Sequence, residues 1–488
     1  MKYVATKHTG ERGGILIQVI AFMTIGMIIL SGFVGWGVMS VRIARHTEMR
    51  EQALEIAEAG IDYYRWHLAH DPTDFQDGTG IAGPYVHDYY NKEGVIIGSF
   101  TIEVIPPTVG STLVTVRSTG AIERDSTITR TIQARLAKTS FAKYALVTNT
   151  DVWEDQVEFF GPYHANGGIH FGNVLAHNVV TSARATYVDP DFGGTHFGVY
   201  TDKPLNPTYP TGDPAPPAVI PDRPDVFIAG RQVAVPAVDF TGLMSDLAAI
   251  KTGAQASGNY YGSSGALGYH IVLKTTGVFD IYTVTARVPA PNAGCSAWYT
   301  YADPGGGMWS IQTEVLLAGN VAYPTNGLIF TEDDVWVDGT INGNRLTIAA
   351  ARFPDNPATR ASIIVNNDLR YTFTDGRDVI GLIAQNYIRV GYASADNLRI
   401  DGAIVAQSGA IWRDYYDPTC GASHKRNNIT TYGSLISNQR YTFSWSCGAY
   451  CSGYATQVST YDANLLYGPP PSFPLTTDQY QILSWDEI

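Results

Sequence analysis

Three histidines lie in one glycine-rich stretch and are of the residue type that most often binds metal ions. His164, His170 and His177 are separated by six and seven residues. An Asn-Gly-Gly corner at 166–168 falls between the first two, so a turn interrupts the strand that would have to align them. We interpret them as surface or corner histidines and predict neither a metal nor a cofactor.

The densest acidic run is Glu332-Asp333-Asp334, with Asp338 close behind it. Carboxylate oxygens are the ligands that Ca²⁺ prefers, which makes Asp333, Asp334 and Asp338 candidate calcium ligands; the simpler interpretation, which we favour, is a solvated turn. The chain has no evident catalytic base beside this run and no Walker loop, G-x-S-x-G or H-E-x-x-H motif. We therefore predict no enzymatic activity and no catalytic residue.

Aromatic residues gather toward the C-terminal end. Rigid aromatic rings serve either as the cap of a terminal coil, which we favour, or as a contact surface for a partner or a sugar. The residues are Trp412, Tyr415, Tyr416, Tyr441, Phe443, Trp445, Tyr450 and Tyr454.

Composition limits the function classes. The 488 residues are too many for one compact domain, only 16% are charged, and 45% are hydrophobic, as in extracellular β-rich proteins. The formal net charge of -13 argues against non-specific binding to nucleic acid.

The elements that position these residues begin with an N-terminal helix. A basic leader at 1–13 precedes an apolar stretch that has no charged residue from Gly14 to Val41. About 28 helical residues span about 40 Å, enough to cross a bilayer with some tilt. Apolar residues then recur at three- and four-residue spacing up to Leu68, so we predict a transmembrane and amphipathic helix over 14–70.

This segment carries a family resemblance. Glu11-Arg12-Gly13 before the apolar stretch, and Ala57-Glu58-Ala59-Gly60 after it, resemble the N-terminus of PilX-type minor type IV pilins and K-type minor pseudopilins. The resemblance implies a prepilin-like leader at 1–13, cleavage by a prepilin peptidase between Gly13 and Gly14, methylation of the new N-terminus, and assembly with other pilins or pseudopilins. The alternative to pilin-like assembly is a simple membrane anchor of one helix.

One residue departs from the family pattern. Major pilins have a glutamate at the fifth mature position, where it meets the N-terminal amine of a neighbour, and this chain has Gln18 there. A neutral amide cannot compensate that buried ammonium. Gln18 therefore favours a tip or initiating role in assembly over a bulk filament subunit.

Topology and cysteine pairing follow from the resemblance. Positive residues flank both ends of the apolar stretch, so charge alone leaves the orientation open, and the prepilin resemblance places the N-terminus in the cytoplasm and the head outside or on the cell surface. The four cysteines, Cys295, Cys420, Cys447 and Cys451, would then form disulfides, with Cys420 expected to pair with Cys447 or Cys451. Zinc is disfavoured because Cys447 and Cys451 have no second close pair.

The rest of the chain is predicted to be mostly β. We expect a small pilin-like meander at 71–140, a first β-helix part at 141–202, a proline-rich strap and inserted lobe at 203–325, a second β-helix part at 326–460, and an extended tail at 461–488. Short Ile- and Val-rich runs bounded by Gly or Asn predict the solenoid. The regions 381–411 and 461–487 also resemble large PilX-like proteins.

The fold class is therefore α+β: a long transmembrane helix, a small antiparallel sheet and an irregular parallel β-helix with an inserted lobe. We expect a minor pilin-like or pseudopilin-like structural protein that assembles into or caps a pilus or secretion pseudopilus, with adhesion to a surface or glycan through its head. The alternatives are a membrane-anchored carbohydrate-active β-helix enzyme and an inert surface-anchored protein.

Overall fold

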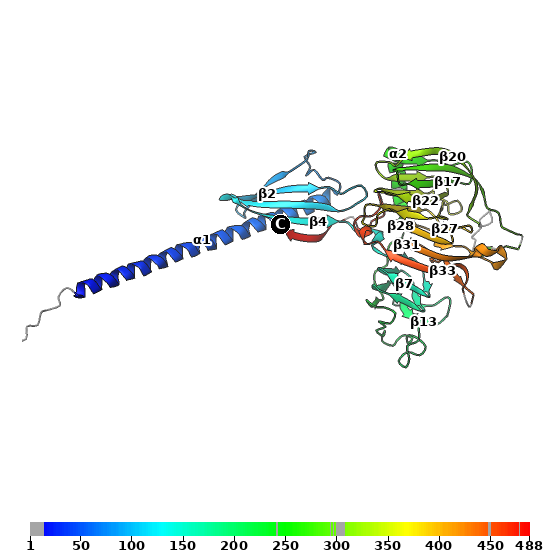
Figure 1. The fold of residues 1–488 in the computed structure, drawn as a ribbon, viewed down its shortest axis with the longest axis horizontal. Coiled ribbons are helices and arrows are strands. Elements are labelled where there is room, and N and C mark those ends of the chain that lie inside the picture. The colour runs from blue at the N-terminus through cyan, green and yellow to red at the C-terminus, as the bar shows by residue number, and fades with distance from the viewer. Residues whose placement is uncertain are drawn as a thin grey trace, which may run out of the picture. The chain divides into compact units, whose positions relative to one another are not determined.

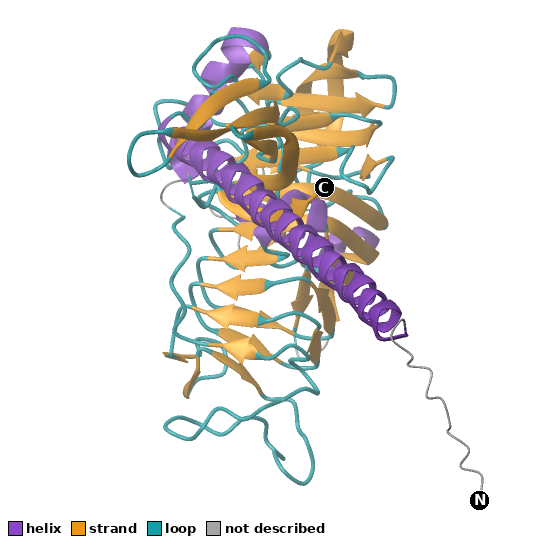
Figure 2. Cartoon of the chain, turned by 90° about the vertical axis from the view of Figure 1, so that its left-hand side faces the viewer, coloured by secondary structure: helices purple, strands orange, loops and turns teal. Residues whose placement is uncertain are grey.

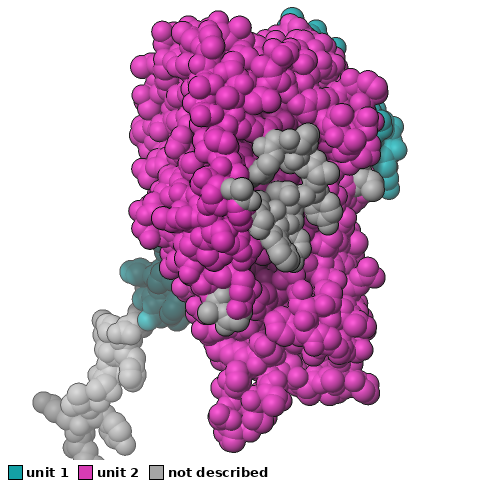
Figure 3. Space-filling model, turned by 90° about the vertical axis from the view of Figure 1, so that its right-hand side faces the viewer, with its two compact units in different colours: residues 1–106, 114–136, 482–488 teal, residues 107–113, 137–481 magenta. Residues whose placement is uncertain are grey.

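The computed structural model describes residues 14–488 apart from 241–242, 293, 296, 299–307, 448–449 and 478. The chain forms two compact units (Figure 3). The helix–sheet unit comprises Met1–Pro106, Val114–Leu136 and Ile482–Ile488. The solenoid unit comprises Pro107–Leu113 and Ala137–Gln481.

The helix–sheet unit combines one long helix with a five-stranded sheet (Figure 1). Helix α1 (Gly14–His70) has 57 residues, about 85 Å of helix, as the apolar stretch and the spacing after it predict. The strand order is β1-β2-β3-β4-β34, with antiparallel pairing from β1 to β4. The strands are β1 (Tyr85–Tyr90), β2 (Ile96–Ile105), β3 (Val114–Ile122), β4 (Asp125–Ala137) and β34 (Gln481–Glu487).

Buried and partly exposed side chains alternate along the strands, which explains why this sheet has one buried face. Every second residue of β3 is buried, from Val114 to Ile122, and Phe100 and Ile102 of β2 face the same way. The expected meander of three strands is present, and the sheet gains two that the sequence pattern did not reveal, β1 and β34. Strand β34 comes from the end of the chain that was expected to form an extended tail.

The solenoid unit is a stack of short strands that pair mainly in parallel, visible as a ladder in Figure 2. Its first part contains β5 (Leu146–Thr148), β6 (Val152–Glu154), β7 (Val157–Phe160), β8 (Tyr163–Ala165), β9 (Ile169–Phe171), β10 (Val174–Ala176), β11 (Val180–Ser182), β12 (Thr186–Val188), β13 (Thr195–Phe197), β14 (Val199–Thr201) and β15 (Arg231–Gln232). Then follow α2 (Leu243–Ser257), β16 (Asn259–Tyr261), β17 (Tyr269–Lys274), β18 (Val278–Arg287), β19 (Ala297–Trp298) and β20 (Ile311–Ala322).

The second part completes the stack, with strands where the Ile- and Val-rich runs predict the solenoid. It contains β21 (Leu328–Thr331), β22 (Val335–Ile341), β23 (Arg345–Ala350), β24 (Ile363–Ile364), β25 (Leu369–Tyr371), β26 (Val379–Ala384), β27 (Ile388–Val390), β28 (Asn397–Ala406), β29 (Ile411–Arg413), β30 (Tyr415–Tyr416), β31 (Lys425–Ser437), β32 (Ser444–Ser446) and β33 (Tyr450–Tyr461).

The stacking order differs from the order along the chain. Parallel pairs run β16–β21–β23–β26–β28–β31–β5–β8–β11–β15, so the first part follows the last coil of the second. The chain therefore enters the stack in its middle, builds to one end, crosses to the other end and returns. Strands β31 and β33 lie inside the stack, in Figure 1 between β28 and β7.

Register places one apolar side chain above another through the core. Each residue of this inner column is aligned with the next across a parallel pair, and all are buried. The column is Ile329, Ile348, Leu382, Ile404, Leu435, Leu146, Tyr163 and Val180. Such stacking removes apolar surface from water coil by coil, which is why no isolated repeat needs its own core.

A second apolar layer covers one outer face of the stack. Phe330, Ala349, Ile383 and Val405 point away from the inner column and pack against connecting segments. The covering residues are Phe141, Ala142, Phe240, Leu247, Ile250, Ala254, Leu465 and Phe473. Burial on both faces explains why β26 reads as an uninterrupted apolar run.

The segment expected as strap and inserted lobe is continuous with the solenoid. Strands β16 and β17 pair in parallel with β21 and β22, and β17, β18 and β20 form an antiparallel extension. Val226 and Phe227, within the segment 203–325, belong to the solenoid core.

Candidate assembly helix and sites in the head

The N-terminal half of α1 is an apolar surface with nothing packed on it in the described chain. Its large hydrophobic side chains between Ile15 and Val41 are 46–75% exposed. It is long and apolar enough to cross a membrane, and no charged residue interrupts it from Gly14 to Val41. Apolar area of this extent is unfavourable in water, so this half of the helix requires lipid or other apolar helices around it.

The C-terminal half of the same helix is buried against its own sheet. The buried residues are Ala53, Ile56, Ala57, Gly60, Ile61, Tyr64 and Leu68, at the spacing of one helix face. A Cβ on Gly60 would lie 2.2 Å from the Ser118 hydroxyl oxygen, and one on Gly120 would lie 2.1 Å from the Ala53 carbonyl oxygen. The Ala57-Glu58-Ala59-Gly60 sequence is thus the part of the helix that lets helix and sheet backbones approach closely.

The residues expected in processing and assembly lie at the start of this helix. Gly13, with the whole leader at 1–13, is outside the described residues. Gly14 is the first residue of α1. Gln18 is exposed in the first turns and places a neutral amide on an otherwise apolar surface, which leaves its proposed assembly role a prediction.

The three histidines have separate surroundings. His164 and His170 are each 1% exposed, so the interpretation of these two as surface histidines is wrong. The His164 ring bonds to Thr181 and Asn166, whereas His177 lies 2.7 Å from Glu158 and stacks on Phe160. Among the described residues no group of three His, Cys, Asp or Glu side chains has the arrangement of a metal site.

The acidic run is part of a buried ion-pair network, so the solvated-turn interpretation is wrong. Asp333 and Asp334 are 3% and 9% exposed. Asp333 pairs with Arg352 and accepts hydrogen bonds from Ser264, while Asp334 lies 3.6 Å from both Arg287 and Arg352. Both carboxylates therefore face arginine side chains, Arg352 among them, and this arrangement gives no support to calcium binding.

Asp338 belongs to a different cluster. Its Oδ2 lies 3.2 Å from His270 Nε2, and His270 Nδ1 lies 2.7 Å from Glu314. Burial lowers the pKa of His270, but the hydrogen bonds and charges of Asp338 and Glu314 outweigh it and the pKa is raised. For Asp338, burial raises the pKa, but the hydrogen bond and charge of His270 outweigh it and the pKa is lowered.

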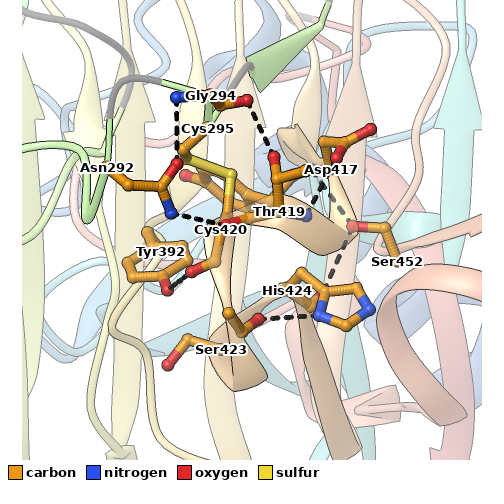
Figure 4. The surroundings of a disulfide bond; sticks show 12 residues. Asn292, Gly294, Cys295, Tyr392, Asp417, Thr419, Cys420, Ser423, His424 and Ser452 are labelled. Carbon is orange, nitrogen blue, oxygen red and sulfur yellow. Dashed lines mark hydrogen bonds between the residues drawn. A yellow bond between two sulfur atoms is a disulfide. The ribbon is translucent and has the colours of Figure 1, made fainter.

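The cysteines pair differently from the expectation. Cys295 bonds to Cys420, 125 residues away, and Cys447 bonds to Cys451. The pairing of Cys420 with Cys447 or Cys451 is therefore wrong, because segments distant in sequence meet on the flank of the solenoid. Around Cys420, Asn292 donates to the Thr419 carbonyl and Thr419 donates to the Gly294 carbonyl, which ties the two segments together (Figure 4).

The aromatic group near the cysteines is mainly core. Trp412, Tyr416, Tyr441, Phe443 and Tyr454 are all buried. The expectation that they cap a terminal coil is wrong, because β31 and β33 stack on β5 and β7 and lie inside the stack. Coil order is set by contacts between distant segments, which no local pattern encodes.

Sequence reasoning missed one titratable core residue. Glu154 of β6 is 6% exposed and accepts a hydrogen bond from the Tyr163 hydroxyl at 3.2 Å. Burial raises the pKa of Glu154 to about 8, which leaves it mostly protonated at neutral pH. A single glutamate in a short Val-Trp-Glu run gave no signal of this.

Comparison with known proteins identifies no family for this chain. No protein-family model and no curated protein matches the chain. The crystal structure of the competence-associated pilin ComZ from Thermus thermophilus is similar over 90% of this chain and 97% of that one, with 14% identity and a TM-score of 0.30. A likeness this weak carries no inference about function, which has to rest on the residues described above.

Proposed function

We propose that this chain is a minor type IV pilin-like or pseudopilin-like structural subunit without catalytic activity. The observation that carries the proposal is the division of α1: its first half is charge-free and exposed, and its second half is locked onto the sheet by small residues. A subunit that joins a helical filament core through its N-terminus and displays a folded domain needs this division.

The finer parts of the proposal come from the leader and from Gln18. A prepilin peptidase cleaves after Gly13, and the amide at Gln18 suits a position at the tip, where no neighbour above supplies an amine to pair with. The solenoid unit then serves as the head, which contacts a surface from the end of a pilus or pseudopilus.

A helix exchange tests assembly against simple anchoring. Residues 14–41 are replaced by an unrelated single-pass membrane helix of equal length, with 1–13 and everything after 41 unchanged. The proposal predicts that the exchanged protein stays in the membrane but disappears from sheared filaments or from pseudopilin complexes. Equal recovery of both proteins with pilins would contradict it and favour a plain anchor.

A further inference from the structure

A cavity of about 440 Å³ opens beside β9 and β14 in the solenoid unit. Its lining includes His170, Phe192, His196, Tyr200 and Asp202. Small-molecule sites of proteins occupy about 300–1,000 Å³, so this cavity is large enough for a ligand of one or two rings.

The inner wall is a stack of three rings. Tyr200 lies between His196 and His170, with ring centroids 3.9 and 4.3 Å apart, and Phe192 meets His170 edge-on at 4.6 Å. Tyr200 is 3% exposed, whereas Phe192 is 56% exposed. Phe192, which also contacts the Trp153 ring at 5.4 Å, therefore offers an exposed apolar surface beside a rigid wall.

Asp189 holds this wall in place. Its carboxylate accepts hydrogen bonds from the Tyr200 hydroxyl at 2.6 Å and from the backbone amides of Asp191 and Phe192 at 2.7 and 3.0 Å. Its Oδ2 also lies 3.1 Å from His170 Nδ1. The loop that carries Phe192 is thus fixed before any ligand arrives, which lowers the entropic cost of binding.

The opposite wall comes from the proline-rich strap. Asp213, whose side chain is 1% exposed, pairs with Arg223 and Arg231. Both guanidinium groups are buried, 0% and 4% exposed, and neither arginine lines the cavity. The cavity consequently presents the Asp202 carboxylate to a ligand and no lysine or arginine among its lining residues, which disfavours an anionic ligand.

Hydrogen-bonding capacity remains at the cavity. Both nitrogens of His170 are buried without a well-formed hydrogen bond in the described chain, although Nε2 lies 3.4 Å from Asp202 Oδ1. The Asp202 side chain is 50% exposed, and Thr201 and Thr211 also line the cavity. Burial lowers the pKa of His170 and outweighs the opposing charges of Asp202 and Asp189, which favours the neutral ring.

We infer that this cavity binds a neutral saccharide. The apolar C–H face of a sugar ring packs on Phe192, and its hydroxyls bond to Asp202 and Thr211, the exposed polar side chains of the lining. The inference gives a site and a ligand class to the contact proposed for the head, and it rests on the proposed function only for its setting at a filament tip.

Binding is measured on the full chain in a detergent without a sugar headgroup. The probes are cellotetraose, chitotetraose, maltotetraose and mannotetraose, with tetragalacturonate as the anionic comparison and Ca²⁺ alone as the metal comparison. Titration calorimetry gives the affinity. Phe192→Ala and Asp202→Asn each remove one contact at exposed positions, and Phe160→Ala is the matched control, because Phe160 is 41% exposed and lies outside the cavity.

The inference predicts that at least one neutral tetrasaccharide binds and that Phe192→Ala and Asp202→Asn each weaken it about tenfold, or about 1.4 kcal/mol, while Phe160→Ala does not. Three results would overturn the inference. The first is that no neutral probe binds, and the second is that all variants bind equally. The third is that only tetragalacturonate, or only Ca²⁺, binds. Filaments are absent from this measurement, so saccharide binding can fail while the assembly proposal stands, and the reverse also holds.

Discussion

The exposed half of α1 and the interior of the solenoid unit reverse the usual distribution of residues. The first exposes apolar side chains and no charge from Gly14 to Val41. The second buries charges, among them Asp213, Arg223, Arg389 and Asp414, and pairs them internally. The buried charges named here thus have partners within the head, whereas nothing in the described chain packs on the exposed half of α1.

The largest expected loss of stability comes from a substitution that breaks a buried ion pair in the head. Asp213→Ala leaves Arg231 and part of Arg223 without their carboxylate, and we expect a loss of about 3–5 kcal/mol in the free energy of unfolding. Denaturant unfolding of the full chain, followed by tryptophan fluorescence, measures it.

The matched control is an exposed pair. Asp375 and Arg377 lie 2.8 Å apart with side chains 55% and 58% exposed, so Asp375→Ala should leave the free energy of unfolding nearly unchanged. Equal losses in the two variants would mean that the buried charges do not support the head.

The next effect concerns the two halves of α1. A Cβ on Gly120 would lie 2.1 Å from the Ala53 carbonyl oxygen, and we expect Gly120→Ala to destabilise the helix–sheet unit by about 1–3 kcal/mol. Hydrogen exchange of the β3 amides reports it. Gly26→Ala is the control, since a Cβ there meets nothing within 4 Å. Faster exchange in both variants, or in neither, would contradict the claim that the C-terminal half of α1 packs closely on the sheet while the N-terminal half packs on nothing in the described chain.

A smaller effect depends on pH. Burial raises the pKa of Glu154 from its ordinary 4.5 to about 8, so the folded state keeps a proton that the unfolded state releases. The stability of the wild type should therefore fall as the pH rises from about 4.5 to about 8, a trend that Glu154→Gln removes. As the pH rises from 5 to 7, the free energy of unfolding of the variant relative to that of the wild type should increase by about 2 kcal/mol. A constant difference across this range would place Glu154 in water.

The smallest effect on the head comes from the helix start. Gln18→Glu should leave head unfolding unchanged, because Gln18 lies in the exposed half. In a tip position the new carboxylate has no amine to meet, and a charge inside a bilayer costs about 2.5–3.5 kcal/mol, so less protein should reach sheared filaments. Increased recovery would instead indicate a place within the shaft.

Local patterns predicted the elements well and their assembly poorly. The charge-free run gave α1, and the Ile- and Val-rich runs gave the strands of the second solenoid part, since both signals lie within a few residues. Strands β1 and β34, the coil order and the Cys295–Cys420 bond depend on segments far apart in sequence. The cavity was missed for the same reason, because His170, Tyr200 and Asp213 come together only when the strap covers β9 and β14. Buried acids such as Asp333 look like surface residues until their arginine partners are placed.

The most direct test of pilin-like assembly is the mature N-terminal residue, determined by mass spectrometry of the protein from native membranes. We predict a start at Gly14 with a methylated amine, which would show that a prepilin peptidase has processed the chain. An intact Met1 would contradict that processing and leave α1 as a permanent anchor.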